Sequence, residues 1–117
     1  ELLGPWTPHP LNPVKIDVTS ARPAGTPFVR DGSLHRPAQD CSETYGGALV
    51  VNRVTRLDEE GFSETVVDRH VGKHDLYQSG THTLSVGGGL VAIDAKRRVI
   101  DVHHAGRGLV ARLRRRR

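Results

Sequence analysis

Residues 47–67 read GALVVNRVTRL (Gly47–Leu57), DEEG (Asp58–Gly61) and FSETVV (Phe62–Val67). The first run is rich in β-branched residues and apolar on both faces at its start, which is typical of a strand covered on both sides. The last run alternates between apolar and polar residues and places Phe62 and Glu64 on one face. The acidic run between them supplies a turn, so this stretch predicts two antiparallel strands.

Two further hairpins are expected on either side of this pair. Strands at 26–30 and 33–36 flank Asp31-Gly32, a dipeptide that suits a tight reversal, and strands at 81–86 and 90–94 flank three glycines. Almost no helical periodicity precedes residue 95. Consecutive antiparallel hairpins predict an all-β fold, and such meanders build sandwiches, barrels or propeller blades. A four-stranded blade takes ~40 to 50 residues, so the chain has room for about two to three blades of an incomplete propeller.

Composition agrees with this fold class. The chain has 117 residues, enough for one domain, and its 13 Gly and 7 Pro exceed the usual share, whereas aromatic residues make up only 4%. Six of the seven prolines lie in residues 1–27, where we expect extended, irregular chain. Because the first residue is Glu1 and methionine is absent, we expect a fragment or a processed product.

The net charge of +4 belongs to one end of the chain. Five of the 17 Lys and Arg residues lie in the last six positions, whereas residues 1–111 hold 12 Lys and Arg against 13 Asp and Glu and are nearly neutral. We expect a partial propeller domain at 1–97 and a basic, flexible tail at 98–117. The single cysteine, Cys41, excludes an internal disulfide and every metal framework that needs several cysteines. No apolar run approaches the ~20 residues of a membrane helix, and no signal segment is recognised. We expect a soluble protein and slightly favour the cytoplasm.

Several short motifs do not indicate a phosphate-binding, metal-binding or hydrolase site. Gly87-Gly88-Gly89 leads into a predicted strand and not into a helix N-terminus, so we interpret it as a turn and not as a phosphate loop. His70 and His74 stand four residues apart, a spacing that presents two metal ligands only on a helix, and His103-His104 falls in the predicted tail. No Gly-x-Ser-x-Gly elbow is present. We predict no metal and no cofactor.

The stretch RPAQDCSETYG (Arg36–Gly46) carries the strongest chemical signal. It combines a guanidinium, an amide, a carboxylate, hydroxyls and an aromatic ring just after a predicted strand. Sugar hydroxyls both donate and accept, so a carbohydrate site uses carboxylates and amides for paired contacts, Arg as a fixed donor fork and a ring for the apolar sugar face. The alternative interpretation is structural: Arg36 and Asp40 form an ion pair that fixes a loop, and Gln39 bonds to the backbone.

An ordered series of motifs extends this signal over most of the chain. The motifs are Trp6-x-x-His9-Pro10-x-Asn12-Pro13-Val14, Ser20-Ala-Arg-Pro-Ala-Gly25, Asp31-Gly32-x-Leu34-x-Arg36-Pro-Ala-Gln-Asp-Cys-Ser42, Tyr45-Gly46, Phe62-x-Glu64 and Gly80-Thr-His-Thr-Leu-Ser85. From residue 6 to about 97 the series resembles the last part of a five-bladed β-propeller of the arabinanase and invertase group. Within that group it is most similar to the N-terminal domain of plant glucosamine inositolphosphorylceramide transferases and their bacterial relatives.

The resemblance implies a ring of blades whose innermost strands point polar residues into a central funnel. Arg22 would open one inner strand and His82 the next, while Glu64 would be a structural partner on an outer strand. Arg36, Gln39 and Asp40 would line or brace the rim of this funnel. The candidate substrate-binding residues are Arg22, Arg36, Gln39, Asp40, Tyr45 and His82. In the propeller hydrolases, cleavage uses separated carboxylates from earlier blades, which this chain lacks, so we expect no catalysis by the chain alone.

Two functions are therefore carried forward. The first is a fragment of a carbohydrate-active β-propeller domain that recognises or processes a glycan or a glycosylated lipid, in either a transferase or a hydrolase context. Its exposed blade edges would favour self-association. The alternative is a small β-sheet interaction module whose Arg-rich end, residues 112–117, binds nucleic acid or another anionic surface through phosphate contacts.

Overall fold

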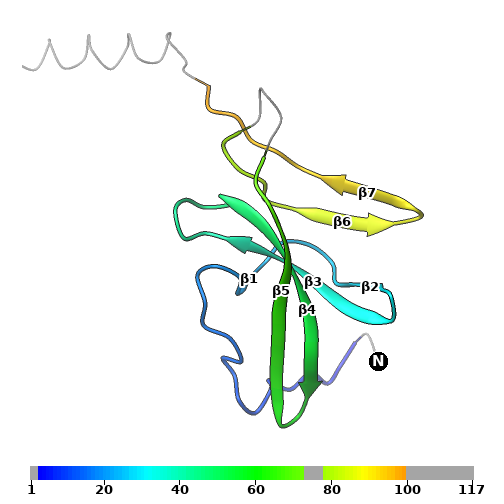
Figure 1. Cartoon of the computed structure of the whole chain (residues 1–117). Coiled ribbons are helices and arrows are strands. Elements are labelled where there is room, and N and C mark those ends of the chain that lie inside the picture. The colour runs from blue at the N-terminus through cyan, green and yellow to red at the C-terminus, as the bar shows by residue number, and fades with distance from the viewer. Residues whose placement is uncertain (1–2, 73–77, 100–117) are drawn as a thin grey trace, which may run out of the picture.

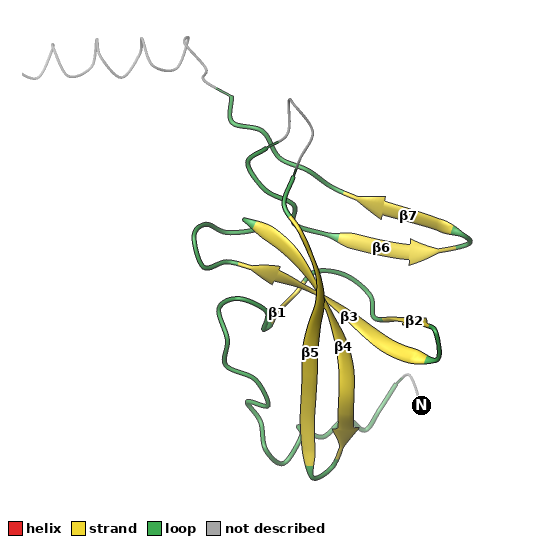
Figure 2. Ribbon diagram, viewed as in Figure 1, coloured by secondary structure: helices red, strands yellow, loops and turns green. Residues whose placement is uncertain are grey.

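The computed structural model describes residues 3–72 and 78–99. Within these ranges the chain forms seven β-strands and no helix (Figure 2). In chain order the strands are β1 (Arg22–Pro23), β2 (Phe28–Arg30), β3 (Ser33–Asp40), β4 (Ala48–Asp58), β5 (Gly61–His70), β6 (Leu84–Gly87) and β7 (Leu90–Ile93). The expected all-β, antiparallel fold is confirmed for these residues, and all three expected hairpins are present.

The first sheet joins two of the predicted hairpins into one unit (Figure 1). Its order is β1–β3–β4–β5, and β2 also pairs with β3. Because β4 occupies one edge of β3, the short strands β1 and β2 share the other edge as two halves of an interrupted strand. The sheet thus has four strand positions. Strands β6 and β7 form a second, two-stranded sheet.

Turns with left-handed backbone close the first and third hairpins. Asp31 and Gly32 have φ angles of 50° and 70°, and Gly88 and Gly89 have φ angles of 57° and 75°. Two consecutive positive φ values define the two-residue turn whose twist matches that of paired strands. The Asp-Gly and Gly-Gly sequences therefore specify these reversals directly.

Strand β3 is longer than predicted and contains Arg36–Asp40, so the expectation that the candidate sugar motif follows the strand is wrong for its first half. Pro37 is tolerated inside the strand because it faces the gap between β1 and β2. In an antiparallel strand the N–H and C=O of one residue point to the same side. The Pro37 carbonyl accepts the Ala24 N–H at 3.1 Å, so the position of the missing Pro37 N–H also faces this gap.

The second sheet attaches at the same gap. The Ala24 carbonyl has no Pro37 N–H to accept, and it accepts the N–H of Leu84 at 2.7 Å instead. The Leu84 side chain is buried against Ala24, Leu49 and Val51. The hydrophobic core therefore lies between one face of the first sheet and the β6–β7 hairpin (Figure 1). Both sheets are open, and no closed barrel or ring forms among the described residues.

The opposite face of the first sheet is covered by irregular N-terminal chain. Lys15 reaches from this segment to Glu64 of β5, with Nζ 2.6 Å from Oε1. With both faces covered, residues 48–52 of β4 are all buried, as the apolar start of this strand predicts. The first sheet is therefore the middle layer of the described structure.

Candidate ligand-binding site

Three of the six predicted substrate-binding residues come together at one exposed position, and we call them the Tyr45 cluster: Arg22, Tyr45 and His82. The Arg22 guanidinium carbon lies 4.8 Å from the centre of the Tyr45 ring. The Tyr45 hydroxyl oxygen lies 2.6 Å from His82 Nε2, and the two ring centres are 5.0 Å apart. Since these residues come from β1, the β3–β4 loop and the approach to β6, the cluster exists only when the second sheet is docked on the first.

Close backbone contact fastens the loop that carries Tyr45 to the segment that carries His82. Gly46 has a φ of 60°, and a Cβ there would lie 3.1 Å from His82 Cδ2. A Cβ on Gly80 would lie 2.1 Å from the Gly46 carbonyl oxygen. The Lys96 ammonium donates to the Tyr45 carbonyl oxygen. Gly80 needs to be glycine because it touches the main chain of Gly46, and Gly46 because it has a positive φ and lies against the His82 ring.

Asp94 holds His82 in place, a role that the sequence analysis missed. Its Oδ1 accepts the backbone N–H groups of His82 (2.8 Å) and Thr83 (2.6 Å). Its Oδ2 lies 3.7 Å from His82 Nδ1, which is also 2.9 Å from the Thr83 hydroxyl. The available signal was an aspartate at the end of the third hairpin, where the chain returns to the start of that hairpin.

The Tyr45 cluster is open to solvent. The Tyr45 residue is 55% exposed and the His82 side chain 36% exposed. The Arg22 side chain stacks on the Tyr45 ring and makes no hydrogen bond within the described residues, so the N–H groups of its guanidinium are available to oxygen acceptors. A ring face, a guanidinium and a phenol–imidazole pair together match the apolar and polar surfaces of a sugar.

Alternation along β3 separates the other three predicted residues. Successive side chains of a strand point to opposite faces, so Arg36 and Asp40 lie on one face and Gln39 on the other. Gln39 is opposite Arg22 in the strand register, but it is buried and its Nε2 donates to the Pro23 carbonyl oxygen at 3.3 Å. The backbone bond expected in the structural interpretation of Gln39 is therefore confirmed.

The ion pair expected between Arg36 and Asp40 is wrong, because each residue pairs with a different residue of β5. Arg36 donates from Nε to Glu64 Oε2 (2.8 Å) and from Nη2 to Glu64 Oε1 (2.5 Å). Arg69 donates to Asp40 Oδ2 from Nη2 (2.8 Å) and from Nε (3.2 Å). The partners stand 28 and 29 residues away in sequence, so local spacing could not reveal them.

Both acceptor carboxylates have lowered pKa values. Burial acts to raise the pKa of Glu64, but hydrogen bonds from Arg36 and Lys15 outweigh burial and hold it below the ordinary value. The pKa of Asp40 is lowered chiefly by a hydrogen bond from the Ser42 hydroxyl. These residues are therefore anions that stabilise the fold at neutral pH. Asp40 also ends β3, directly before the loop that carries Tyr45.

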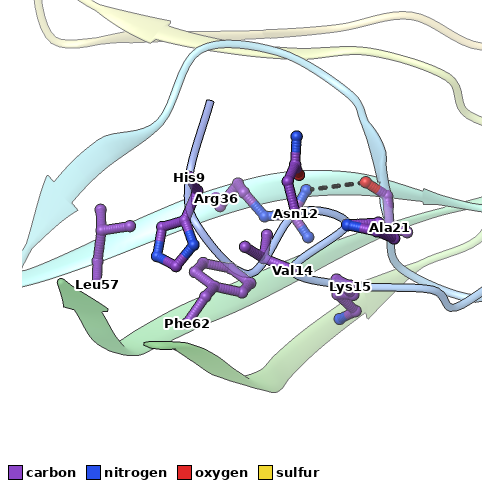
Figure 3. A pocket seen from close by; sticks show the side chains of 9 residues that line it. His9, Asn12, Val14, Lys15, Ala21, Arg36, Leu57 and Phe62 are labelled. Atoms are coloured by element: carbon purple, nitrogen blue, oxygen red, sulfur yellow. Dashed lines mark hydrogen bonds between the residues drawn. The ribbon is translucent and has the colours of Figure 1, made fainter. Parts of the chain in front are cut away.

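Arg36 lines a separate pocket of about 350 Å³ beneath the N-terminal segment (Figure 3). Leu57 and Phe62 contribute apolar walls, and both His9 ring nitrogens bond to backbone groups. Arg36 itself also donates to the Ala21 carbonyl oxygen at 3.4 Å, the dashed line in Figure 3. Because His9 and Arg36 already have protein partners, they offer few further contacts to a sugar in this pocket.

Some predictions lie outside the described residues: those on His74, on His103-His104 and on the Arg-rich end at 112–117. His70, which is described, has its Nε2 2.9 Å from Asp68 Oδ2. In the described ranges, no three His, Cys, Asp or Glu residues gather as a metal site would require. The same ranges contain no helix with the length and apolarity needed to cross a membrane.

The described part of the chain is thus an antiparallel all-β structure that presents aromatic and polar groups where its two sheets meet. The chain belongs to the family described as glucosamine inositolphosphorylceramide transferase 1, N-terminal, whose model matches residues 1–83. All three residues of the Tyr45 cluster lie within the matched part, and Asp94 lies beyond it. The resemblance to this family, inferred from the sequence motifs, is thus confirmed.

Curated relatives of this chain carry the name that appears in the family description. A glucosamine inositolphosphorylceramide transferase 1 from Oryza sativa subsp. indica is 41% identical over 68 residues, which cover 56% of this chain and 9% of the rice protein. Its counterpart from Arabidopsis thaliana is 42% identical over 67 residues, again 56% of this chain and 9% of the relative. The similarity therefore spans only a small part of these relatives. No solved structure matches the chain.

Proposed function

We propose that this chain is part of a β-propeller domain that recognises a glycan or a glycosylated lipid and that it is not catalytic alone. The family name supports a link to glycolipid processing, because the relatives are named glucosamine inositolphosphorylceramide transferase 1. The observation that carries the proposal is the convergence of Arg22, Tyr45 and His82 from three separate segments. This exposed cluster is where we place the contact with sugar.

The packing of the two sheets supports the propeller. Arg22 begins β1 and His82 precedes β6, so the two residues take corresponding positions in successive sheets. Propeller blades are four-stranded sheets arranged around a central channel. We therefore interpret the first sheet as one blade of a five-bladed ring and the β6–β7 hairpin as the first half of the next blade.

The three remaining candidate residues receive supporting roles. Gln39 is buried beneath the strand position of Arg22, and Asp40 accepts the Ser42 N–H at 3.0 Å at the start of the loop that leads to Tyr45. Arg36 is occupied by Glu64 on the other face. Direct contact is thus proposed for Arg22, Tyr45 and His82 only.

The ion pairs and hydrogen bonds that the carboxylates already form support recognition over catalysis. Glycoside hydrolysis uses two carboxyl groups on either side of the scissile bond. Glu64 and Asp40 are held in ion pairs, and one oxygen of Asp94 is bonded to two backbone N–H groups. Glu64 and Asp40 are therefore not free to act on a bond in a sugar, and Asp94 has one of its two oxygens committed to the backbone.

Sugar binding by the 117-residue chain tests the proposal. D-glucosamine, myo-inositol and D-glucose are titrated into ¹⁵N-labelled protein, and we expect saturable shifts at Tyr45, His82 and neighbouring amides for at least one of them. Arg22→Gln and Tyr45→Ala should each weaken that binding about tenfold, which is the loss expected from one stacking or charged contact.

Arg53→Gln is the matched control, because Arg53 is an exposed arginine of β4 away from the Tyr45 cluster. It should leave the affinity unchanged. If no sugar gives saturable shifts, or if the shifts map to the pocket beside Phe62, the proposed site is wrong.

A further inference from the structure

We propose that Asp94 fixes the tautomer of His82 and thereby sets the direction of the hydrogen bond at Tyr45, so that the cluster presents an acceptor to its ligand. Asp94 acts here as a positioning residue that never touches the ligand. The tautomer is a property of the protein by itself. Only the consequence for ligand choice rests on the proposed function.

The first step concerns the two ring nitrogens of His82. In a neutral imidazole one nitrogen carries a proton and the other accepts. His82 Nδ1 faces the Asp94 carboxylate at 3.7 Å and the Thr83 hydroxyl at 2.9 Å, whereas Nε2 faces the Tyr45 hydroxyl at 2.6 Å. The hydroxyls of Thr83 and Tyr45 can each donate or accept. The carboxylate can only accept, and its negative charge favours a proton on Nδ1.

The second step concerns the phenol, which points to the same assignment. A phenol hydroxyl is a stronger acid than an aliphatic hydroxyl and therefore a good donor to an sp² nitrogen. The Arg22 guanidinium over the Tyr45 ring adds positive charge, which stabilises the partial negative charge that develops on the phenol oxygen when its hydroxyl donates a hydrogen bond. Both effects favour a bond in which Tyr45 donates to His82 Nε2.

The charged groups around His82 are consistent with this direction. Among the residues that the structure describes, the charged side chains in contact with the cluster besides Asp94 are Arg22 over the Tyr45 ring and Lys96, whose ammonium is bound to the Tyr45 carbonyl oxygen. Neither cation is in hydrogen-bond contact with a ring nitrogen of His82. Asp94 is thus the anion that decides between the two tautomers.

A consequence for the ligand follows from the direction of this bond. When the Tyr45 proton is directed at His82, only lone pairs of the phenol oxygen remain for an incoming group. The cluster then combines an acceptor at Tyr45 with donors on Arg22. It selects a ligand that donates to Tyr45 and accepts from Arg22, as neighbouring hydroxyls of a sugar or cyclic polyol do.

The tautomer is measured directly in the 117-residue chain by ¹⁵N NMR of the histidine rings. Spectra are recorded near pH 8.5, where an ordinary imidazole is neutral, and His82→Gln identifies the His82 signals. We expect the pattern of a protonated Nδ1 and an unprotonated Nε2. A proton on Nε2, or a mixture of tautomers, would overturn the proposal.

Asp94→Asn tests the cause. Asparagine keeps an oxygen for the backbone N–H groups of His82 and Thr83 but can turn an NH₂ group toward Nδ1. An Asp-to-Asn change beside an imidazole can leave the geometry intact while exchanging the tautomer. We therefore expect His82 to become protonated at Nε2. Asp68→Asn is the control, because Asp68 contacts His70 at 2.9 Å, and it should leave the His82 signals unchanged.

The ligand consequence is tested with neutral probes, so that the lost charge of Asp94 does not bias the comparison. The probes are D-glucose and its monodeoxyfluoro analogues, in which fluorine cannot donate. At the contacted position we expect fluorine to weaken binding about tenfold in the wild type and threefold or less in Asp94→Asn. An equal penalty in both proteins would refute the acceptor assignment. If no sugar binds at all, the proposed function fails while the tautomer result stands.

Discussion

Glu64 joins two parts of the molecule that share no strand pairing. Its side chain is 2% exposed, and Oε1 lies 2.5 Å from Arg36 Nη2 and 2.6 Å from Lys15 Nζ. Arg36 belongs to the central strand β3, whereas Lys15 belongs to the segment that covers the sheet. A buried anion of this kind is tolerated only while its partners stay in place.

We expect Glu64→Gln to lower the free energy of unfolding by about 3 kcal/mol, because the amide leaves Arg36 without a counter-charge and leaves Lys15 with Asp17 alone, 3.4 Å away. Urea denaturation followed by circular dichroism measures the loss. Glu60→Gln is the matched control, since Glu60 pairs with Arg56 while its own side chain is 87% exposed, and it should leave the midpoint unchanged. Equal effects of the two variants would mean that the burial of Glu64 is unimportant.

The same two variants should separate in acid. The pKa values of Glu64 and Asp40 lie below their ordinary values, so each carboxylate adds stability above the pKa of the unfolded chain, near 4. That stability is lost as the pH falls through the lower, folded-state pKa. Unfolding free energy should therefore decline below about pH 4.5 in the wild type and in Glu60→Gln. A decline of equal size in Glu64→Gln would contradict this account.

Residue types in this chain were predictable, but their partners were not. The mixture of groups at 36–46 indicated a polar cluster, and the motif series indicated Arg22 and His82. Arg36 and Asp40 found partners on β5 because a strand register, not sequence distance, decides which side chains meet. Asp94 escaped notice for the same reason: its contact with His82 depends on how the third hairpin closes.

At the scale of elements, the glycine between β1 and β2 controls how the sheets meet. Gly25 has a φ of 140°, and a Cβ there would lie 1.8 Å from the Leu84 carbonyl oxygen. That oxygen belongs to main chain and cannot move without displacing β6. The gap in the edge strand is therefore shaped to receive the second sheet.

Gly25→Ala should destabilise the protein by about 2 kcal/mol or more, through the clash and the strained φ together. Gly87→Ala is the control, because a Cβ at Gly87 would meet no atom within 4 Å and Gly87 lacks a positive φ. It should change stability by less than about 0.5 kcal/mol. Thermal unfolding of both variants makes the comparison, and a neutral Gly25→Ala would show that the sheets can separate at this gap without cost.

Local elements were predicted well because their signals are local. Asp31-Gly32 and Gly87-Gly88-Gly89 have the backbone freedom that a tight hairpin needs. The apolar start of β4 predicted a strand that is buried on both faces. The longer reach of β3 was missed. A proline in a central strand is acceptable only opposite an interruption in its neighbour, and that interruption is a tertiary feature.

At the scale of the molecule, the β6–β7 hairpin leaves apolar side chains exposed. Leu90 is 75% exposed, Val91 68% and Ile93 53%, and residues 84–93 contain no charged side chain. In the described part of the chain, β7 pairs with β6 alone. Strand edges without charges are prone to pair with other chains. We therefore propose that the chain self-associates through this hairpin.

Sedimentation velocity over a range of concentrations should reveal this association. Leu90→Lys should shift the protein toward the monomer, because a buried ammonium on the hairpin is costly. Leu11→Lys is the matched control, since Leu11 is 58% exposed on the segment that covers the opposite face of the sheet. A wild type that stays monomeric, or an equal response of the two variants, would exclude the hairpin as the contact.

The missing N–H of Pro37 also gives the molecule an order of assembly. The Ala24 carbonyl becomes a docking point only after β1 has paired with β3, because until then nothing distinguishes it from any other solvated carbonyl. The hairpin that begins with Leu84 can dock only on a first sheet that presents this carbonyl. The Tyr45 cluster needs both sheets, so it is completed last. During synthesis from the N-terminus, the cluster would form only after the segment that carries His82 and Asp94 has been made.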